Sequence, residues 1–367
     1  MSTDVQLHSE SSTLIQVSED PLCRESTLTS LNTWITPTER YYIRNHFSDV
    51  PNLDRSTWRL VIDGEVRQPL NLSFADILAM PSKEIVTTME CAGNSRSYVT
   101  PPAEGLAFRH GVVSTARWKG LPLNALLEQA GLKDTAAELV FEGADHGREE
   151  EDGVAFDLNY RRSLPLEKAR HPDTLLAYEM NGQVLTSDHG FPLRLVVPRW
   201  YGMASVKWLT RVNVIDQPFE GFFQKRRYVM ISEGPKDSLE SAPVTALKVK
   251  SLITSPRHGE VIQPGAYTIR GFAWSGEGEV KRVEVSTDGG LYWQDAALLG
   301  ESDPNAWRQW ELIWRTSFPG HFIFMVRATD STGHTQPHTI TWNFRGYANN
   351  SIHTIAIEVP APMAIPS

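Results

Sequence analysis

Cys91 is the residue whose type and setting most directly suggest chemistry. It ends an apolar run and opens a turn that contains Gly93, and Arg96 follows five residues later. A thiol that a strand delivers into a tight turn beside a positive charge is well placed to be a thiolate, which is both a nucleophile and a soft metal ligand. Taken alone, however, an isolated cysteine is more often a small buried apolar side chain. Cys91 therefore needs partners elsewhere in the chain.

One group of possible partners is Arg44, Asn45 and His46, which follow one another directly. Together they place a guanidinium, an amide and an imidazole at one spot, and these donors suit an anion and a polar heterocycle. A solvated loop would explain the same three residues equally well.

A second group of possible partners consists of His189, Arg194 and Lys207. Their spacing allows them to converge where two loops meet a strand, and together they could bind a phosphate and ring nitrogens. Individually, each has an ordinary structural explanation, as a capping histidine, a surface arginine or a lysine whose stem covers apolar surface.

The elements that must position these residues form a mixed α and β domain from Trp58 onward. Hydrophobic periodicity and capping signals predict strands over 58–64, 85–91, 138–142 and 193–197, and helices over 73–80 and 122–130. Between these elements lie long loops rich in Gly, Asp, His, Arg and Pro. Functional sites are usually built on such loops when a rigid core holds them.

The pattern changes after about residue 235, where a polar linker begins. Beyond it, helical periodicity gives way to short strands, predicted over 280–286, 291–293, 312–314, 322–328 and 339–344. We therefore predict an α+β fold in three parts. A flexible N-terminal segment over 1–30 precedes a catalytic domain over 31–240 and an immunoglobulin-like β-sandwich over 245–367.

The composition argues against several classes of protein. The net charge of −9 over 367 residues disfavours nucleic acid as a bulk partner. With only two cysteines and no Cys-x-x-Cys-His motif, a Cys-rich zinc or iron–sulfur site and an attached c-type haem are excluded. The sequence contains no apolar run long enough for a membrane helix, and its polar start lacks the regions of a signal peptide. We expect a cytoplasmic protein, or a periplasmic one if a leader has been removed.

Seven short blocks in order resemble the sulfite oxidase family of molybdopterin-dependent oxidoreductases, in particular its haem-free bacterial or plant-like members. The resemblance covers roughly residues 35–360. The blocks are Arg44-Asn45-His46, Cys91-Ala92-Gly93-Asn94, Ala116-Arg117-Trp118, Phe141-Glu142-Gly143 followed by Asp145, Leu176-Ala177-Tyr178-Glu179-Met180-Asn181-Gly182, Asp188-His189-Gly190-Phe191-Pro192 and Val206-Lys207-Trp208-Leu209.

The resemblance implies a molybdenum–molybdopterin cofactor without haem, with the thiolate of Cys91 bound to molybdenum. The residues implied to hold the pterin and its phosphate are Tyr42, Arg44, Asn45, His46, Asp145, His189, Arg194, Ser205 and Lys207. Those implied to form the substrate pocket are Arg44, Arg96, Tyr228 and Arg345, with Phe108 at the position of the family's pocket tryptophan. Three arginines around one small site suit an oxyanion, because each offers paired hydrogen bonds and the anion relieves their mutual repulsion.

Three positions depart from the family pattern. Phe108 lacks the indole N–H of the tryptophan it replaces, Ser95 stands where vertebrate-like members have a second arginine, and Arg199 replaces an expected small residue. These departures leave the cofactor expectation unchanged, whereas Phe108 and Ser95 bear on the identity of the substrate. The other cysteine, Cys23, matches no family motif, and we expect it to have no role.

The reaction that the resemblance implies is oxidation of sulfite to sulfate, with electrons passing to dioxygen or a separate cytochrome. The sandwich implies a homodimer. One alternative is a member that acts on another small oxyanion, such as nitrate, or on a sulfoxide, and another is a non-catalytic scaffold that keeps the fold. Retention of Arg345 favours sulfite over nitrate, and the sandwich argues against the sulfoxide-reducing branch.

Overall fold

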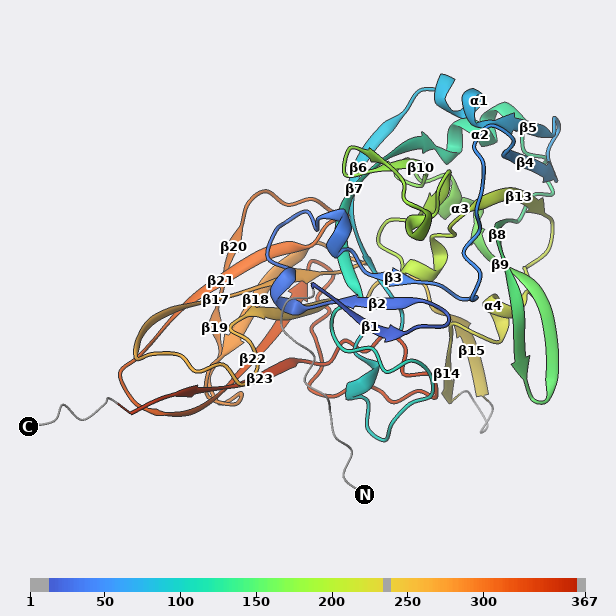
Figure 1. Cartoon of the computed structure of the whole chain (residues 1–367). Coiled ribbons are helices and arrows are strands. Elements are labelled where there is room, and N and C mark those ends of the chain that lie inside the picture. The colour runs from blue at the N-terminus through green and yellow to red at the C-terminus, as the bar shows by residue number, and fades with distance from the viewer. Residues whose placement is uncertain (1–12, 234–238, 362–367) are drawn as a thin grey trace, which may run out of the picture.

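The computed structural model describes residues 13–233 and 239–361 and shows two parts that pack against each other (Figure 1). The described helices all lie in the N-terminal part: α1 (Phe74–Ala79), α2 (Leu123–Ala130), α3 (Leu166–Ala169) and α4 (Phe222–Lys225). Strands dominate over helices, and the predicted mixed domain followed by a β-sandwich is confirmed. Within the described ranges, no helix has the length and apolar character that crossing a membrane requires.

Two five-stranded sheets and a three-stranded sheet build the N-terminal part. The first has the order β11-β10-β7-β6, with β12 also pairing with β10; its strands are β6 (Lys83–Glu90), β7 (Val113–Pro122), β10 (Leu175–Met180), β11 (Gln183–Val184) and β12 (Arg194–Val196). The second has the order β5-β4-β13-β8-β9; its strands are β4 (Arg59–Gly64), β5 (Leu70–Ser73), β8 (Glu138–Glu151), β9 (Val154–Pro165) and β13 (Leu209–Ile215). Most of the site residues lie at the ends of these strands.

The three-stranded sheet corrects the expectation of a flexible segment over 1–30. Residues 13–30 contain β1 (Leu14–Ser18) and β2 (Cys23–Ser26), and β2 pairs with β3 (Ile43–Arg44), while residues 1–12 lie outside the described ranges. The polar composition of this segment is misleading, because its polar groups have partners. The carboxylate of Glu25 is buried and accepts hydrogen bonds from the backbone N–H and the Nε of Arg109, each at 2.8 Å.

The C-terminal part is a sandwich of two four-stranded sheets. One has the order β16-β17-β21-β20, with β16 (Lys250–Ser255), β17 (Gly265–Trp274), β20 (Ala297–Leu299) and β21 (Arg308–Thr316). The other has the order β19-β18-β22-β23, with β18 (Val280–Ser286), β19 (Gln294–Asp295), β22 (Gly320–Asp330) and β23 (His353–Val359). The hairpin of β14 (Val229–Glu233) and β15 (Leu239–Pro243) precedes the sandwich.

The strand predicted over 339–344 is wrong, and the last strand of the sandwich is β23 instead. The segment forms a loop that packs on the N-terminal part. Trp342 Nε1 donates to the carbonyl of Pro101 at 2.9 Å. The Asn343 side chain holds a turn by accepting from the N–H of Tyr347 and donating to its carbonyl. Hydrogen bonds thus hold this segment as a loop against the N-terminal part, while the side chains of Trp342 and Phe344 stay exposed.

A buried ion pair joins the two parts directly beside Cys91. Lys250, at the start of β16, donates to Glu90 Oε1 at 2.8 Å, and both side chains are almost fully buried. Glu90 also accepts from Asn94 Nδ2 at 2.9 Å and from Trp274 Nε1 at 2.8 Å. One carboxylate therefore ties the turn after β6 to two strands of the sandwich.

We expect Lys250→Met to destabilise the protein by about 3–5 kcal/mol, because it leaves the carboxylate of Glu90 buried without its counter-charge. Urea unfolding of the purified protein measures the change. Lys281→Met is the matched control, since Lys281 pairs with Glu279 at 2.9 Å on the surface and exposed pairs contribute little. Equal effects of the two substitutions would show that the buried pair does not hold the parts together.

Candidate active site

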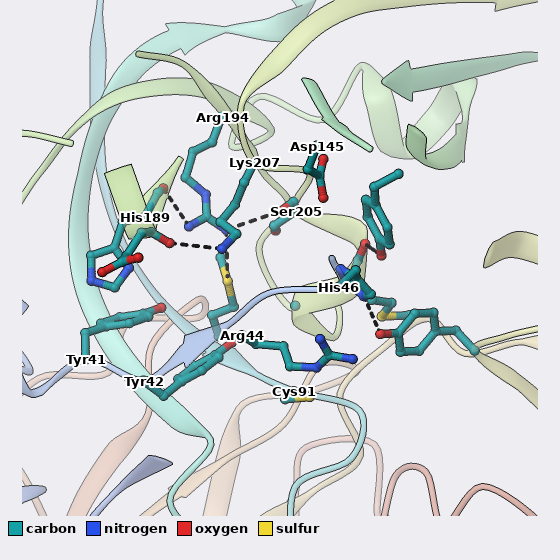
Figure 2. A pocket seen from close by; sticks show the side chains of 16 residues that line it. Tyr41, Tyr42, Arg44, His46, Cys91, Asp145, His189, Arg194, Ser205 and Lys207 are labelled. Carbon is teal, nitrogen blue, oxygen red and sulfur yellow. Dashed lines mark hydrogen bonds between the residues drawn. The ribbon is translucent and has the colours of Figure 1, made fainter. Parts of the chain in front are cut away.

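Most of the residues that the sequence singles out line one cavity in the N-terminal part (Figure 2). The cavity encloses about 600 Å³ of space, a figure that includes space open to solvent. The predicted residues among its lining are Tyr42, Arg44, His46, Cys91, Asp145, His189, Arg194, Ser205, Lys207 and Tyr228. They lie at or near the ends of β3, β6, β12 and β13 and just before β14, except for Asp145, which lies within β8 where its pairing with β9 is irregular. The site therefore depends on both large sheets.

Cys91 lies immediately after β6, where its N–H donates to the carbonyl of Val112 at 2.9 Å. The turn that follows requires glycine, because a Cβ at Gly93 would lie 2.7 Å from Arg96 Nη2. Burial raises the pKa of the Cys91 thiol, while the nearby charges of Arg44 and Arg96 and the backbone N–H of Gly93 lower it. The predicted positive environment of this thiol is therefore present, although burial opposes its effect.

One wall of the cavity gathers cations among backbone carbonyls. Arg194 donates to the carbonyls of His189 at 3.0 Å and Ser205 at 3.1 Å, and Lys207 donates to the carbonyl of Asp188 at 2.9 Å. Burial and the charge of Arg194 lower the pKa of Lys207 to about 7. Burial and the same two cations lower the pKa of His189 to about 3, so its ring is neutral near pH 7. The wall suits an anion together with a neutral hydrogen-bonding group.

Unpaired buried polar atoms surround the same cavity. Among the described residues, the hydroxyl of Tyr41, Oδ1 of Asp145 and Nε of Arg194 are buried without a hydrogen-bond partner, and all three residues line the cavity. Nδ2 of Asn45 is also unpaired, while Oδ1 of Asn45 accepts from Lys207. Leaving such groups unpaired is costly. A bound group with donors, acceptors and negative charge would satisfy them, which fits a pterin that carries a phosphate.

Tyr228 lies at another wall of the cavity, and His46 contacts it directly. His46 Nε2 lies 2.5 Å from the hydroxyl of Tyr228, and its ring stacks on Tyr160 with 4.0 Å between ring centres. Burial, together with the charges of Arg44, Lys207 and Arg162, lowers the pKa of His46 well below its usual value. A neutral His46 can therefore exchange a hydrogen bond with Tyr228, so His46 reaches both the cofactor wall and the predicted substrate side.

The remaining predicted residues do not line the cavity. Phe108 is buried in the same apolar cluster as Cys91. Arg96 is buried, and it donates through Nε to the carbonyl of Arg345 at 2.7 Å and through Nη1 to the carbonyl of Leu106 at 2.9 Å. The guanidinium of Arg345 forms ion pairs with two carboxylates instead of lining the cavity. Its predicted place in an arginine cage is therefore not the place that the structure shows.

Sequence reasoning missed several residues of the site. Tyr347 stacks on Tyr228 with 5.2 Å between ring centres and lies 5.2 Å from the guanidinium of Arg96. Arg162 is fully buried behind Tyr228, at 5.7 Å from its ring centre. Both belong to segments outside the family blocks, so only their proximity in three dimensions identifies them. Tyr41 could have been predicted from the sequence, since it directly precedes the candidate Tyr42.

Cys23 also lies closer to the site than expected. It pairs with Arg44 across β2 and β3, it is fully buried, and its sulfur lies 3.9 Å from Arg44 Nη1. Nothing in the sequence indicated a role for Cys23, and the pairing of β2 with β3 places it next to a residue that lines the cavity.

We expect the stability of the cofactor-free protein to rise with pH above about 7, because of Lys207. Its pKa is about 7 in the folded chain but about 10.4 when unfolded. The unfolded chain therefore binds more protons between these values, and stability increases with pH across that window. Urea unfolding at pH 7 and pH 9 tests this. Lys207→Met should show a smaller rise than the wild-type protein, and an equal rise in both would assign the effect elsewhere.

Comparison with known proteins identifies the family of this chain. The family model "Oxidoreductase molybdopterin binding domain" matches residues 47–223, and the model "Mo-co oxidoreductase dimerisation domain" matches residues 241–360. The Arabidopsis thaliana sulfite oxidase is 32% identical over 359 residues, which cover 90% of this chain and 89% of the plant protein. The crystal structure of the sulfane dehydrogenase SoxCD from Paracoccus pantotrophus has a TM-score of 0.80 at 30% identity, and the match covers 96% of this chain and 92% of that chain.

The human mitochondrial sulfite oxidase is 43% identical over 347 residues, which cover 89% of this chain. The match covers only 62% of the human protein, and the same share of the mouse protein. The motifs, the fold and the full-length plant relative lead to the same assignment. The chain belongs to the sulfite oxidase family and is a molybdopterin oxidoreductase related to sulfite oxidase.

Proposed function

We propose that this protein oxidises sulfite to sulfate at the cavity beside Cys91 and passes two electrons to a separate acceptor, either dioxygen or a cytochrome. The balanced half-reaction converts sulfite and water to sulfate, two protons and two electrons. The observation that carries the proposal is the placement of Cys91 and Arg44 in one cavity with Tyr228 and a cationic wall. Sulfite is a small oxyanion, and arginine binds such anions through paired hydrogen bonds.

The residues fit a molybdenum–molybdopterin group. Cys91 supplies a soft thiolate ligand for the metal. Arg194 and Lys207 supply the positive charge for a phosphate, while Tyr41, Asn45 and Asp145 have buried groups that need partners. When bound, the group supplies two-electron oxidation with transfer of an oxygen atom. The residues of the chain then hold it, exclude water from it and orient the substrate.

Three side chains are placed to handle the substrate and its proton chemistry. Arg44 lines the cavity and offers a guanidinium to the anion. Tyr228 lines it too, and its hydroxyl shares a hydrogen bond with His46. Because the ring of His46 is neutral, its Nε2 can either donate a hydrogen bond to the hydroxyl of Tyr228 or accept one from it. The pair can therefore adjust its hydrogen bond as the charge on the bound anion changes. Tyr347 and Arg162 pack against Tyr228 and keep its ring in place.

We expect the purified, cofactor-loaded protein to contain about one molybdenum per chain and to reduce an artificial acceptor when sulfite is added. Cys91→Ser should retain the fold but lose most of the metal and the activity, because an alcohol is a harder and weaker ligand than a thiolate. Elemental analysis and acceptor reduction measure the two properties. A metal-free chain from a host that makes the cofactor would instead support a non-catalytic scaffold.

Identifying the substrate requires a comparison of several candidate compounds rather than a test of sulfite alone. Phe108 stands where the family pattern implies a pocket tryptophan, and it is buried in the same apolar cluster as Cys91 without lining the cavity, so the indole N–H of that pattern is absent. Sulfite, nitrate and a sulfoxide should therefore be compared on the same metal-loaded sample. Turnover with nitrate or a sulfoxide but not with sulfite would replace the proposed substrate while leaving the cofactor assignment intact.

We also propose a homodimer formed through the sandwich. Its surface carries large apolar side chains in the open, including Leu291 at 89%, Phe318 at 75% and Ile313 at 57% exposure. The main support for the dimer is the family model of a dimerisation domain that matches residues 241–360. Sedimentation equilibrium at micromolar concentration should give twice the mass of the chain, and a concentration-independent monomer would contradict the proposal.

A further inference from the structure

Two carboxylates of the N-terminal part hold Arg345 of the C-terminal part. Arg345 Nη1 lies 3.1 Å from Glu104 Oε2, and Nη2 lies 3.4 Å from Glu151 Oε1. The side chains of Arg345 and Glu151 are only 20% and 18% exposed, whereas that of Glu104 is 56% exposed. The two pairs therefore differ in how strongly solvent screens them.

The position of Glu151 is fixed by the turn that follows it. Glu151 pairs with Val154 at the tip of the hairpin of β8 and β9, which projects from the domain in Figure 1. Asp152 and Gly153 between them have φ of 54° and 74°, as a two-residue hairpin turn of type I′ requires. Arg227 anchors the same carboxylate, with Nη1 at 2.7 Å from Oε1. Glu151 is thus held in place rather than free to follow Arg345.

The loop that carries Glu104 is fixed as well. The N–H of Glu104 donates to the carbonyl of Phe344 at 3.1 Å, so this loop is bonded to the segment of Arg345. Beneath it, Gly105 has a φ of 117°, and a Cβ there would lie 2.9 Å from Arg96 Nη1. Glu104 and Arg345 are therefore presented to each other by backbone contacts.

Arg345 nevertheless belongs to the surroundings of the cavity. Its carbonyl accepts from Arg96 Nε at 2.7 Å. The charges of Arg96, Arg345 and Arg44 all act on Tyr347. Tyr347 in turn stacks on Tyr228, which lines the cavity. One tyrosine therefore lies within electrostatic reach of all three arginines.

We propose that Glu104 and Glu151, together the carboxylate latch, set the affinity of the site for its anionic substrate by competing with that anion for Arg345. The inference rests on the proposed oxidation of an oxyanion. A carboxylate and a sulfur oxyanion offer a guanidinium the same paired acceptors. Each must be released before the other binds, so the latch subtracts its own interaction energy from the affinity for the anion.

Neutralising the latch should tighten anion binding. In Glu151→Gln, the inhibition constant of sulfate and the KM for sulfite should both fall by about three- to tenfold, as expected when Arg345 loses one partly buried counter-charge. The substitution also removes the ion pairs of Glu151 with Arg227 and Arg226, so its effect has to be shown to depend on Arg345. Glu104→Gln should act in the same direction but less, because Glu104 is more exposed. It also provides a second variant if Glu151→Gln folds poorly.

The chain offers a matched control in Glu150→Gln. Glu150 lies between Glu149 and Glu151 on β8 and its side chain is exposed, so alternation directs it to the other face of the strand. The substitution removes the same charge at almost the same distance without removing a partner of Arg345. A long-range field effect would appear equally in both variants, whereas the latch affects only Glu151→Gln.

The experiment is a sulfate titration by calorimetry on molybdenum-loaded protein, alongside sulfite kinetics, for each variant, for Arg345→Met and for Arg345→Met combined with Glu151→Gln. Glu151→Gln should give no gain in sulfate affinity when the double variant is compared with Arg345→Met alone. The latch is overturned if Glu151→Gln binds sulfate no better than wild type or Glu150→Gln, or if the gain survives without Arg345. Failure of sulfite turnover in wild type would reject the proposed substrate alone, since the sulfate titration does not depend on turnover.

Discussion

The accumulation of positive charge around one buried cavity is the constraint on which the rest of the structure depends. Arg44, Arg194 and Lys207 line the cavity, and Arg96 and Arg162 are buried just behind it. Cations removed from water are costly unless they are paired. The fold meets this cost only in part, through backbone carbonyls such as those of His189, Ser205 and Asp188. The pKa of Lys207 is lowered because part of the cost of burying these positive charges is not offset. An anionic cofactor would offset it.

This constraint explains why the two parts of the chain are interlocked. The ends of strands from both large sheets place the cations, but the loop before β23 brings Tyr347 against Tyr228 and Arg345 to the edge of the site. The buried pair of Glu90 and Lys250 fixes the turn of Cys91 to the sandwich. A movement of the sandwich relative to the N-terminal part would therefore disturb Cys91 and the Tyr228 side of the cavity together. The sandwich completes the site as well as serving as a candidate dimer surface.

The motifs predicted much of the lining of the cavity, because those residues lie next to strands whose apolar pattern is easy to identify. Cys91 after β6, Arg194 at the start of β12 and Lys207 before β13 are examples. The errors lie where a partner distant in the sequence decides the structure. Glu25 is buried because Arg109 meets it, and the segment around Trp342 is a loop because Pro101 lies opposite. Neither residue type nor periodicity encodes such a partner.

The position of Arg345 also depends on partners distant in the sequence, Glu104 and Glu151. These ion pairs can be interpreted in terms of function. Sulfate, the product of the proposed reaction, is an oxyanion like the substrate, so a cage of arginines that grips one also retains the other. Tight binding of the product slows its release, and product release limits kcat in many enzymes. If Arg345 returns to its ion pairs with Glu104 and Glu151 when the anion leaves, it contributes less to the affinity for the product. The ion pairs of Glu104 and Glu151 with Arg345 are thus better understood as a limit on anion affinity than as a contribution to stability, since partly exposed pairs contribute little to folding.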